Sequence, residues 1–155
     1  MRMRAVLGVL GGLVILMLLV ALVLPVVTSP AQAQTGSRKV FQISMVSYMF
    51  TPSLITVNRG DTVVLQFSND DPERRNHSIA SRLFMRIEPK ASGEFRTGVG
   101  DERRFFAAEP GKKFELEFVA SEAGSFPFVC GVFDHGSRGQ TGAINVVAAA
   151  ARPAP

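Results

Sequence analysis

Apolar and polar residues alternate over much of the chain between residues 39 and 147, and the alternation stops at clusters of glycine, proline and aspartate. In the stretch KFELEF, the apolar residues Phe114, Leu116 and Phe118 share one side and glutamates occupy the other. A period of two residues is typical of half-buried strands, whereas an amphipathic helix repeats about every 3.6 residues. The pattern therefore predicts an all-β fold, an antiparallel sandwich or barrel with Greek-key connections.

Two segments depart from a plain series of strands. In SFPFVC, Phe126, Phe128 and Cys130 are two residues apart, so a strand that buries the phenylalanines also turns the cysteine thiol toward the core. Residues 82–104 break the alternation and are rich in charge. We predict that this segment is a long excursion between strands, with room for a short helical turn.

The start of the chain has the pattern of a membrane-targeting segment over residues 1–33. Arg2 and Arg4 precede an apolar run over residues 5–27, and AQA at residues 31–33 offers a small-residue cleavage site. The run is also long enough to remain as a spanning anchor with the arginines inside the cell. Signal peptide and anchor both stay open, and both predict an extracytoplasmic domain, periplasmic or secreted, in an oxidising compartment.

Charge and length exclude some classes of function. The chain has 17 basic and 13 acidic residues, and removing Arg2 and Arg4 leaves 15 against 13, which is nearly neutral. The remaining arginines are scattered without aromatic interleaving, so no nucleic-acid binding is predicted.

The length suits one domain over residues 39–147. Residues 148–155, AAAARPAP, are predicted to be a disordered tail.

The single cysteine is the starting point for the chemistry. Taken alone, Cys130 is best interpreted as a buried small apolar residue, because one cysteine forms no internal disulfide. However, four residues separate it from His135 and four more separate His135 from Gln140, with glycines that let the backbone bend around one point. His77 follows a predicted strand that ends near Ser68. One cysteine and two histidines, with methionine or glutamine as a weak axial ligand, form the donor set of a trigonal copper site.

These residues and their flanking stretches resemble the cupredoxin family, the small blue-copper proteins such as plastocyanin and azurin. The resemblance rests on FTPSLITVNRGDTVVLQF, the pair Asn76 and His77, PGKKFELEF, and GSFPFVCGVFDHGSRGQTGAINV. It implies a cupredoxin-like domain that holds one copper ion, Cu(I) or Cu(II). It also implies the roles of four residues: His77, Cys130 and His135 as equatorial ligands, and Gln140 as the axial ligand.

The chain departs from the common family pattern at the axial position. Most members have methionine there, and Gln140 resembles the axial glutamine of stellacyanin-like members. An amide oxygen is a harder ligand than a thioether and favours Cu(II), which lowers the reduction potential. Met45, Met49 and Met85 are alternative axial ligands, although methionines in such segments more often pack in a core. Asp134 adds a carboxylate directly before His135.

Other metal centres need residues that the sequence lacks. The two-copper centre of oxidase subunits needs a second cysteine in the loop, and a multicopper oxidase needs more than two histidines. A structural zinc site usually has more cysteines or a fourth strong ligand, and Gln140 is neither. No nucleophile with a base and an orienting group can be identified, so the chain is not predicted to be an enzyme.

The resemblance implies that the domain passes single electrons between redox partner proteins. His135 is then the expected exit for the electron, and Phe133 part of an apolar contact with a partner. Two other functions stay open: a copper-binding module for storage, delivery or sensing in which the metal does not cycle, and a metal-free sandwich that acts as an interaction domain.

Overall fold

The computed structural model describes residues 36–148. The predicted leader over residues 1–33 and the predicted tail beyond residue 148 lie outside the described residues. Within the described part, no helix is long and apolar enough to cross a membrane.

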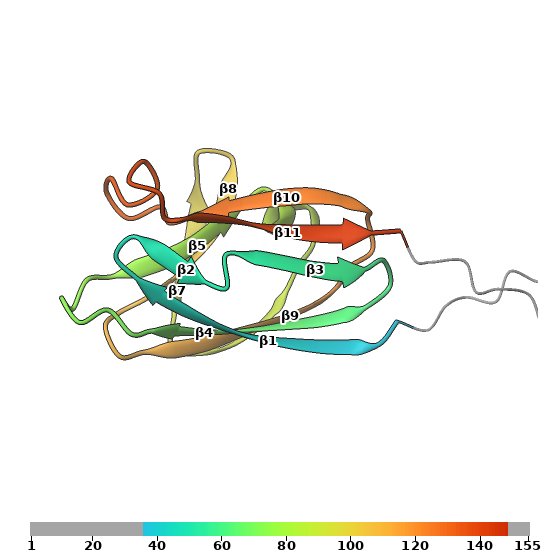
Figure 1. The fold of residues 1–155 in the computed structure, drawn as a ribbon, viewed down its shortest axis with the longest axis horizontal. Helices are drawn as coiled ribbons and strands as arrows, with labels where there is room; N and C mark the ends of the chain where they lie inside the picture. Colours follow the sequence, from blue (N-terminus) through green and yellow to red (C-terminus); the bar gives the residue numbers. More distant parts are fainter. Residues whose placement is uncertain (1–35, 149–155) are drawn as a thin grey trace, which may run out of the picture. The chain divides into compact units, whose positions relative to one another are not determined.

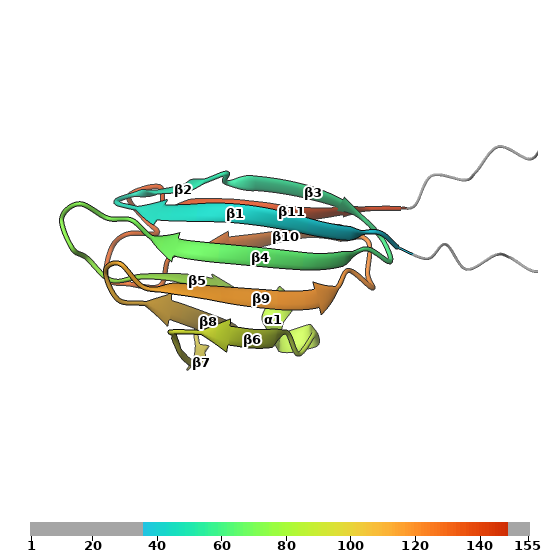
Figure 2. The same ribbon diagram turned by 90° about the horizontal axis from the view of Figure 1, so that it is seen from below.

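Eleven strands form two sheets that lie as two layers, with one short helix, α1 (Leu83–Arg86), beside them (Figures 1 and 2). The order in the five-stranded sheet is β2 (Met49–Thr51), β1 (Arg38–Val46), β4 (Thr62–Asn69), β9 (Lys113–Val119) and β6 (Lys90–Gly93). The order in the six-stranded sheet is β3 (Leu54–Asn58), β11 (Thr141–Val147), β10 (Gly124–Val129), β5 (His77–Ser81), β8 (Arg103–Ala108) and β7 (Arg96–Gly100). The predicted all-β sandwich is confirmed.

Two strand pairs are parallel, contrary to the expectation of a purely antiparallel sandwich. They are β1 with β4 and β3 with β11. The chain leaves the first sheet after β2 and runs through β3 in the opposite sheet, so β4 returns beside β1 in the same direction. The path from β2 through β3 to β4 therefore connects the two sheets near the start of the domain.

The core lies between the sheets and follows the predicted alternation. Phe114, Leu116 and Phe118 of β9 are all buried. They stand opposite three buried residues of β4, which are Phe67, Leu65 and Val63. The rings of Phe67 and Phe114 are stacked with their centroids 4.8 Å apart. Burial of such a side chain contributes about 1.5–3 kcal/mol, so these six residues on the inner face of the five-stranded sheet contribute substantially to the stability of the core.

The segment 82–104 is more regular than predicted. It contains α1, which matches the expected helical turn, but it also contains β6, β7 and the start of β8. β6 and β7 are the last strands of their sheets and are mostly exposed on both sides, so their sequences show no apolar alternation. Asp101 and Glu102 both have positive φ and join β7 to β8 as a two-residue hairpin turn.

A buried carboxylate fixes the start of the domain. Asp61 accepts hydrogen bonds from the Asn58 backbone N–H at 2.9 Å and from the backbone N–H and hydroxyl of Ser37 at 2.9 and 3.1 Å. The Asn58 bond is the main reason that the pKa of Asp61 lies below its ordinary value, and the Ser37 bonds add to it against the opposing effect of burial. The carboxylate therefore holds the turn before β4 and the segment that leads into β1.

We expect Asp61→Asn to reduce the free energy of unfolding at neutral pH by about 1–3 kcal/mol, because the amide cannot accept all three bonds. A depressed native pKa contributes stability fully above the unfolded value of about 3.9 and loses it as the pH falls through the native value. The difference between the two proteins should therefore shrink on acidification. Urea unfolding at a series of pH values measures it, with Asp101→Asn in the exposed hairpin turn as the control. A pH-independent difference would contradict this account.

Candidate metal centre

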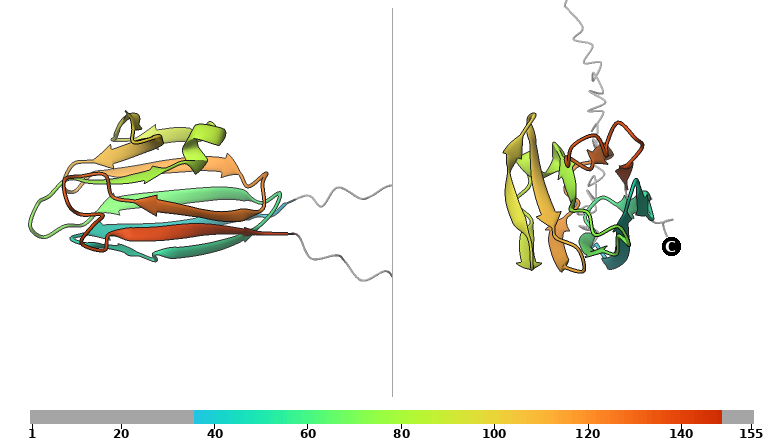
Figure 3. Two further views of the ribbon diagram at one scale, coloured as in Figure 1. Left: turned by 90° about the horizontal axis from the view of Figure 1, so that it is seen from above. Right: turned by 90° about the vertical axis from the view of Figure 1, so that its left-hand side faces the viewer.

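Three loops meet at one end of the sandwich. They are the turn between β1 and β2, the loop over residues 70–76 after β4, and the loop over residues 130–140 after β10. Figure 3 shows the two longer loops at the same end, while the described chain starts and stops at the opposite end (Figures 1 and 3). His77 opens β5 and Cys130 follows β10, so two neighbouring strands carry ligand candidates to this end.

Three predicted ligands converge at a single point. Nδ1 of His135 lies 3.3 Å from Nδ1 of His77, and Sγ of Cys130 lies 3.6 and 3.9 Å from these two nitrogens. All three residues are buried, and their donor atoms form a group that could hold a metal ion. The point equidistant from the three atoms lies about 2.1 Å from each, close to metal–nitrogen lengths of about 2.0–2.1 Å and metal–sulfur lengths of about 2.3 Å. The donor set and its spacing fit one transition-metal ion.

Gln140 is the fourth predicted residue at this point. It is fully buried, its Oε1 lies 2.9 Å from Nδ1 of His77, and its Nε2 donates to the carbonyl of Met49 at 3.5 Å. The backbone fixes it as well, because Cys130 N–H donates to its carbonyl and its own N–H donates to the carbonyl of His135. The amide oxygen is therefore well placed to face a bound ion, and its role as axial ligand stays a prediction.

The three methionines proposed as alternatives have other surroundings. Met45 is fully buried in the hydrophobic core cluster, and the side chains of Met49 and Met85 are about half exposed. Their placement agrees with the interpretation of these residues as packing and surface side chains.

The thiol of Cys130 is held by Ser78, a residue that the sequence analysis did not assign to the site. The Ser78 backbone N–H donates to Sγ at 3.4 Å, and the Ser78 hydroxyl accepts a bond from Gly131 N–H at 2.9 Å. Burial alone would raise the pKa of the Cys130 thiol, but hydrogen bonds from His77 and the Ser78 N–H outweigh it and lower the pKa. The surroundings thus favour the thiolate, the form that binds metal. By contrast, Asn76, which was matched to the family pattern, has an exposed side chain.

The return of the chain from the loop requires glycine at one position. A Cβ on Gly142 would lie 2.3 Å from the ring of Phe128 and 2.3 Å from the carbonyl of Ser53. Phe128 and Gly142 are directly paired between β10 and β11. The close approach lets β11 start immediately after Gln140, which keeps this residue at the site.

His77 has a carboxylate partner on its far side that the sequence analysis also missed. Nε2 of His77 lies 2.6 Å from Oδ2 of Asp71, and both side chains are fully buried. Burial would raise the pKa of Asp71, but hydrogen bonds from Ser47, His77 and the Glu73 N–H lower it to about 2. Burial lowers the pKa of His77, and its contacts with Cys130 and Asp71 more than offset this, so the net direction is upward.

His135 is packed against the only tyrosine of the chain. The ring of Tyr48 meets the His135 ring edge-on, with centroids 5.1 Å apart. The guanidinium of Arg138 lies 3.9 Å above the Tyr48 ring, and Arg75 donates to the Tyr48 hydroxyl at 2.7 Å. His135 is only 4% exposed, and its burial together with the neighbouring His77 lowers its pKa. Its ring is therefore suited to be a neutral metal ligand.

The residues beside His135 form the outer surface of this end. Phe133 is 98% exposed and has a φ of 44°, a backbone conformation that a bulky residue rarely adopts. Asp134 faces Arg138 at 3.7 Å, so the carboxylate noted in the sequence is directed to an arginine. Phe133 is therefore accessible at the surface, and its contact with a partner stays a prediction.

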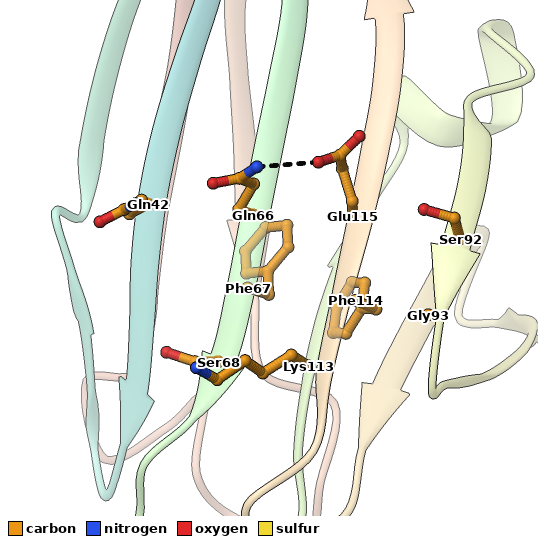
Figure 4. Close-up of a pocket in the computed structure, with 9 residues that line it drawn as sticks. All are labelled: Gln42, Gln66, Phe67, Ser68, Ser92, Gly93, Lys113, Phe114 and Glu115. Carbon is orange, nitrogen blue, oxygen red and sulfur yellow. Dashed lines mark hydrogen bonds between the residues drawn. The ribbon is translucent and has the colours of Figure 1, made fainter.

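A separate hollow of about 410 Å³ lies on the outer side of the five-stranded sheet (Figure 4). Gln66 donates to Glu115 across it at 2.9 Å, and Lys113 and Ser92 add further polar groups. None of the four predicted ligands lines it. The hollow is therefore unconnected with the metal centre.

Comparisons with known proteins agree with this description. A family model described as "Cupredoxin-like domain" matches residues 15–141. Auracyanin B aligns with a TM-score of 0.54 and 12% identity, covering 74% of this chain and 91% of its own. Reduced auracyanin from Roseiflexus castenholzii aligns with a TM-score of 0.52 and 17% identity, covering 72% and 99%. Auracyanin A from Chloroflexus aurantiacus, described as a "blue" copper protein, aligns with a TM-score of 0.51 and 16% identity, covering 71% and 99%. No curated protein sequence matches the chain.

The Ser78 contact predicts how the cysteine loop is anchored. Ser78→Ala leaves the Gly131 N–H without its acceptor, which should reduce the free energy of unfolding by about 1–3 kcal/mol and speed amide exchange at Gly131. Ser137→Ala is the matched control, because this hydroxyl belongs to the same loop but bonds the Asp134 carbonyl at the exposed surface. Equal effects of the two substitutions on Gly131 exchange would refute a special role of Ser78.

Proposed function

The chain belongs to the cupredoxin-like family, and from this premise we propose that it is a mononuclear blue-copper protein that carries single electrons between redox partners. The observation that carries the proposal is the convergence of His77, Cys130 and His135 within 3.3–3.9 Å at a buried point. The likeness to the auracyanins supports the fold, and one of them, auracyanin A, is described as a "blue" copper protein, which agrees with the donor set.

Four side chains would hold the copper ion. His77, Cys130 and His135 would supply two imidazole nitrogens and a thiolate, and Gln140 would supply an amide oxygen as the stellacyanin-like axial ligand. When bound there, copper supplies one-electron exchange between Cu(I) and Cu(II). The chain keeps the donors fixed, since strands β5 and β10 and the hydrogen bonds of Ser78 and Asp71 leave them little freedom to move. A fixed donor set keeps reorganisation small when the charge changes.

An electron carrier, rather than an enzyme, fits the burial of the donors. His77, Cys130 and Gln140 are at most 2% exposed, so these three side chains offer almost no surface to a substrate. His135 lies nearest the surface formed by Tyr48 and Phe133, and we assign it as the exit for the electron. A redox partner would dock on this end.

The location is part of the proposal. Residues 1–33 are proposed to act as a signal peptide or, through residues 5–27, as a membrane anchor. Residues 39–147 would then be an extracytoplasmic copper-binding domain, periplasmic or secreted, followed by a disordered tail over residues 148–155. The intact mass of the protein in the membrane and soluble extracytoplasmic fractions distinguishes cleavage from anchoring.

A non-cycling copper module is the second candidate, because an amide oxygen from Gln140 favours Cu(II). The burial of the donors speaks against it, since delivery requires the ion to leave. A reversible one-electron potential of the copper-loaded protein supports transport, and copper that binds without such a potential supports storage or sensing. A protein that binds no copper would be an interaction domain.

Cys130→Ser tests the metal assignment. The thiolate supplies the copper–thiolate charge-transfer transition, so the substitution should abolish an intense visible band that the wild-type protein shows with Cu(II). Circular dichroism should show that the fold survives, because serine is close in size to cysteine and a large apolar core holds the two sheets together. Ser137→Ala in the same loop should keep the band. Persistence of the band in Cys130→Ser would overturn the assignment.

Gln140→Met tests the axial position. A thioether stabilises Cu(II) less than an amide oxygen does, so the reduction potential should rise while the charge-transfer band stays. About 60 mV corresponds to a tenfold change in the relative stability of the two states, roughly 1.4 kcal/mol. Gln42→Met, an exposed glutamine on β1, is the matched control and should leave the potential unchanged. An unchanged or lower potential in Gln140→Met, with copper bound, would show that Gln140 does not face the ion.

A further inference from the structure

We propose that Asp71 is a positioning residue of the metal centre. Its carboxylate holds His77 in the tautomer that presents Nδ1 to Cys130 and His135, and its buried negative charge favours the oxidised state of a bound metal. The second part rests on the proposed function, and the first part concerns the protein chain alone.

The two ring nitrogens of His77 have different partners. Nε2 lies 2.6 Å from Oδ2 of Asp71, whereas Nδ1 lies within 3.9 Å of donor atoms from His135, Cys130 and Gln140. A neutral imidazole carries one proton, and the nitrogen without it is the one that binds metal. A proton on Nε2 can be donated to Asp71, which leaves the lone pair of Nδ1 directed at the site.

Asp71 is itself held in place by three bonds. The Ser47 hydroxyl donates to Oδ2 at 2.5 Å, the Glu73 N–H donates to Oδ1 at 2.7 Å, and the Asp71 N–H donates to the side-chain oxygen of Asn69 at 3.2 Å. The Asn69 amide in turn donates to the carbonyls of Arg75 and Ala108, both at 2.9 Å. The carboxylate therefore has one orientation, and it transmits this orientation to the His77 ring.

The neighbouring aspartate provides an internal comparison. Asp70 is exposed and accepts bonds from the hydroxyls of Ser44 and Ser68 instead. The two carboxylates carry the same charge one residue apart, but only that of Asp71 is buried against His77. Charge interactions are much stronger in a buried, low-dielectric site than at a solvated surface. Asp71 should therefore influence the metal centre far more than Asp70.

Asp71→Asn removes the charge and keeps the size. In addition, the amide can turn its NH₂ toward Nε2, which would move the ring proton to Nδ1 and block the metal-binding nitrogen. In the metal-free full-length protein at mildly alkaline pH, nitrogen NMR of the side chain should show the Nε2–H tautomer of His77 in the wild type and in Asp70→Asn. In Asp71→Asn the Nδ1–H tautomer should appear. With only two histidines in the chain, the signals are readily assigned.

The copper-loaded proteins give an independent measurement. The reduction potential of Asp71→Asn should be about 59 mV higher than that of the wild type. For one electron, this shift corresponds to a tenfold change in the ratio of oxidised to reduced protein. Asp70→Asn should match the wild type. Ser47→Ala should shift the potential the other way, because loss of the Ser47 bond leaves more negative charge on the oxygen that faces His77.

The signs of the two potential shifts distinguish an electrostatic effect of the Asp71 charge from a general loss of order at the site. A rise in Asp71→Asn with a fall in Ser47→Ala supports the proposal, and shifts of the same sign in both variants overturn it. If Asp71→Asn does not fold, a Ser47→Ala potential at or above the wild-type value overturns the proposal. An unchanged His77 tautomer in Asp71→Asn, with a potential equal to that of Asp70→Asn, also overturns it. A wild-type protein that binds no copper refutes the proposed function instead, while the tautomer measurement still decides the role of Asp71.

Discussion

Two imidazole nitrogens and one sulfur lie 3.3–3.9 Å apart at the end of an apolar core, and this close approach of electron-rich atoms is the constraint on which the surrounding structure depends. Lone pairs directed at one point repel one another, and buried polar atoms without partners are costly. The fold meets this cost by giving two of the donors a second partner. His77 is bonded to Asp71, and Cys130 is bonded to the Ser78 backbone.

The same contacts hold the donor atoms in the fixed arrangement that the proposed electron transfer requires. β5 and β10 are paired in one sheet and pack against the phenylalanine-rich core. They therefore hold His77 and Cys130 on a rigid support. The loop over residues 130–140 is closed by backbone bonds from Cys130 to Gln140 and from Gln140 to His135. Donors that are preorganised in this way need little movement when the charge of a bound ion changes.

The sequence predicts the regular parts of this structure well, because a period of two directly reports burial. Phe126, Phe128 and Cys130 are all buried as expected, and the four predicted site residues meet at one point. The edge strands β6 and β7 escaped notice because solvent covers both of their sides, which removes the alternation.

The residues around the ligands escaped notice for a different reason. Asp70 and Asp71 are identical in type and adjacent in sequence, and only the path of the loop decides which of them meets His77. Ser78 and Tyr48 likewise act through contacts with segments about 50 or more residues away. Nothing in a single sequence marks such pairs, whereas a cysteine, a histidine and a glutamine at even steps in a glycine-rich loop are visible directly.

Charge balance links Asp71, Gln140 and the burial of the site. With a thiolate as the only anionic ligand, a Cu(II) centre is positively charged and a Cu(I) centre is neutral, so burial favours the reduced state. The carboxylate of Asp71, which is hydrogen-bonded to His77, adds a second negative charge. With this charge included, the net charge of the ion, its ligands and Asp71 would be zero for Cu(II) instead of Cu(I). An axial amide oxygen acts in the same direction. With Gln140 in the proposed axial position, Asp71 and Gln140 would both oppose the effect of burial, and the proposed copper site is expected to have a potential toward the low end of the range that its fold allows.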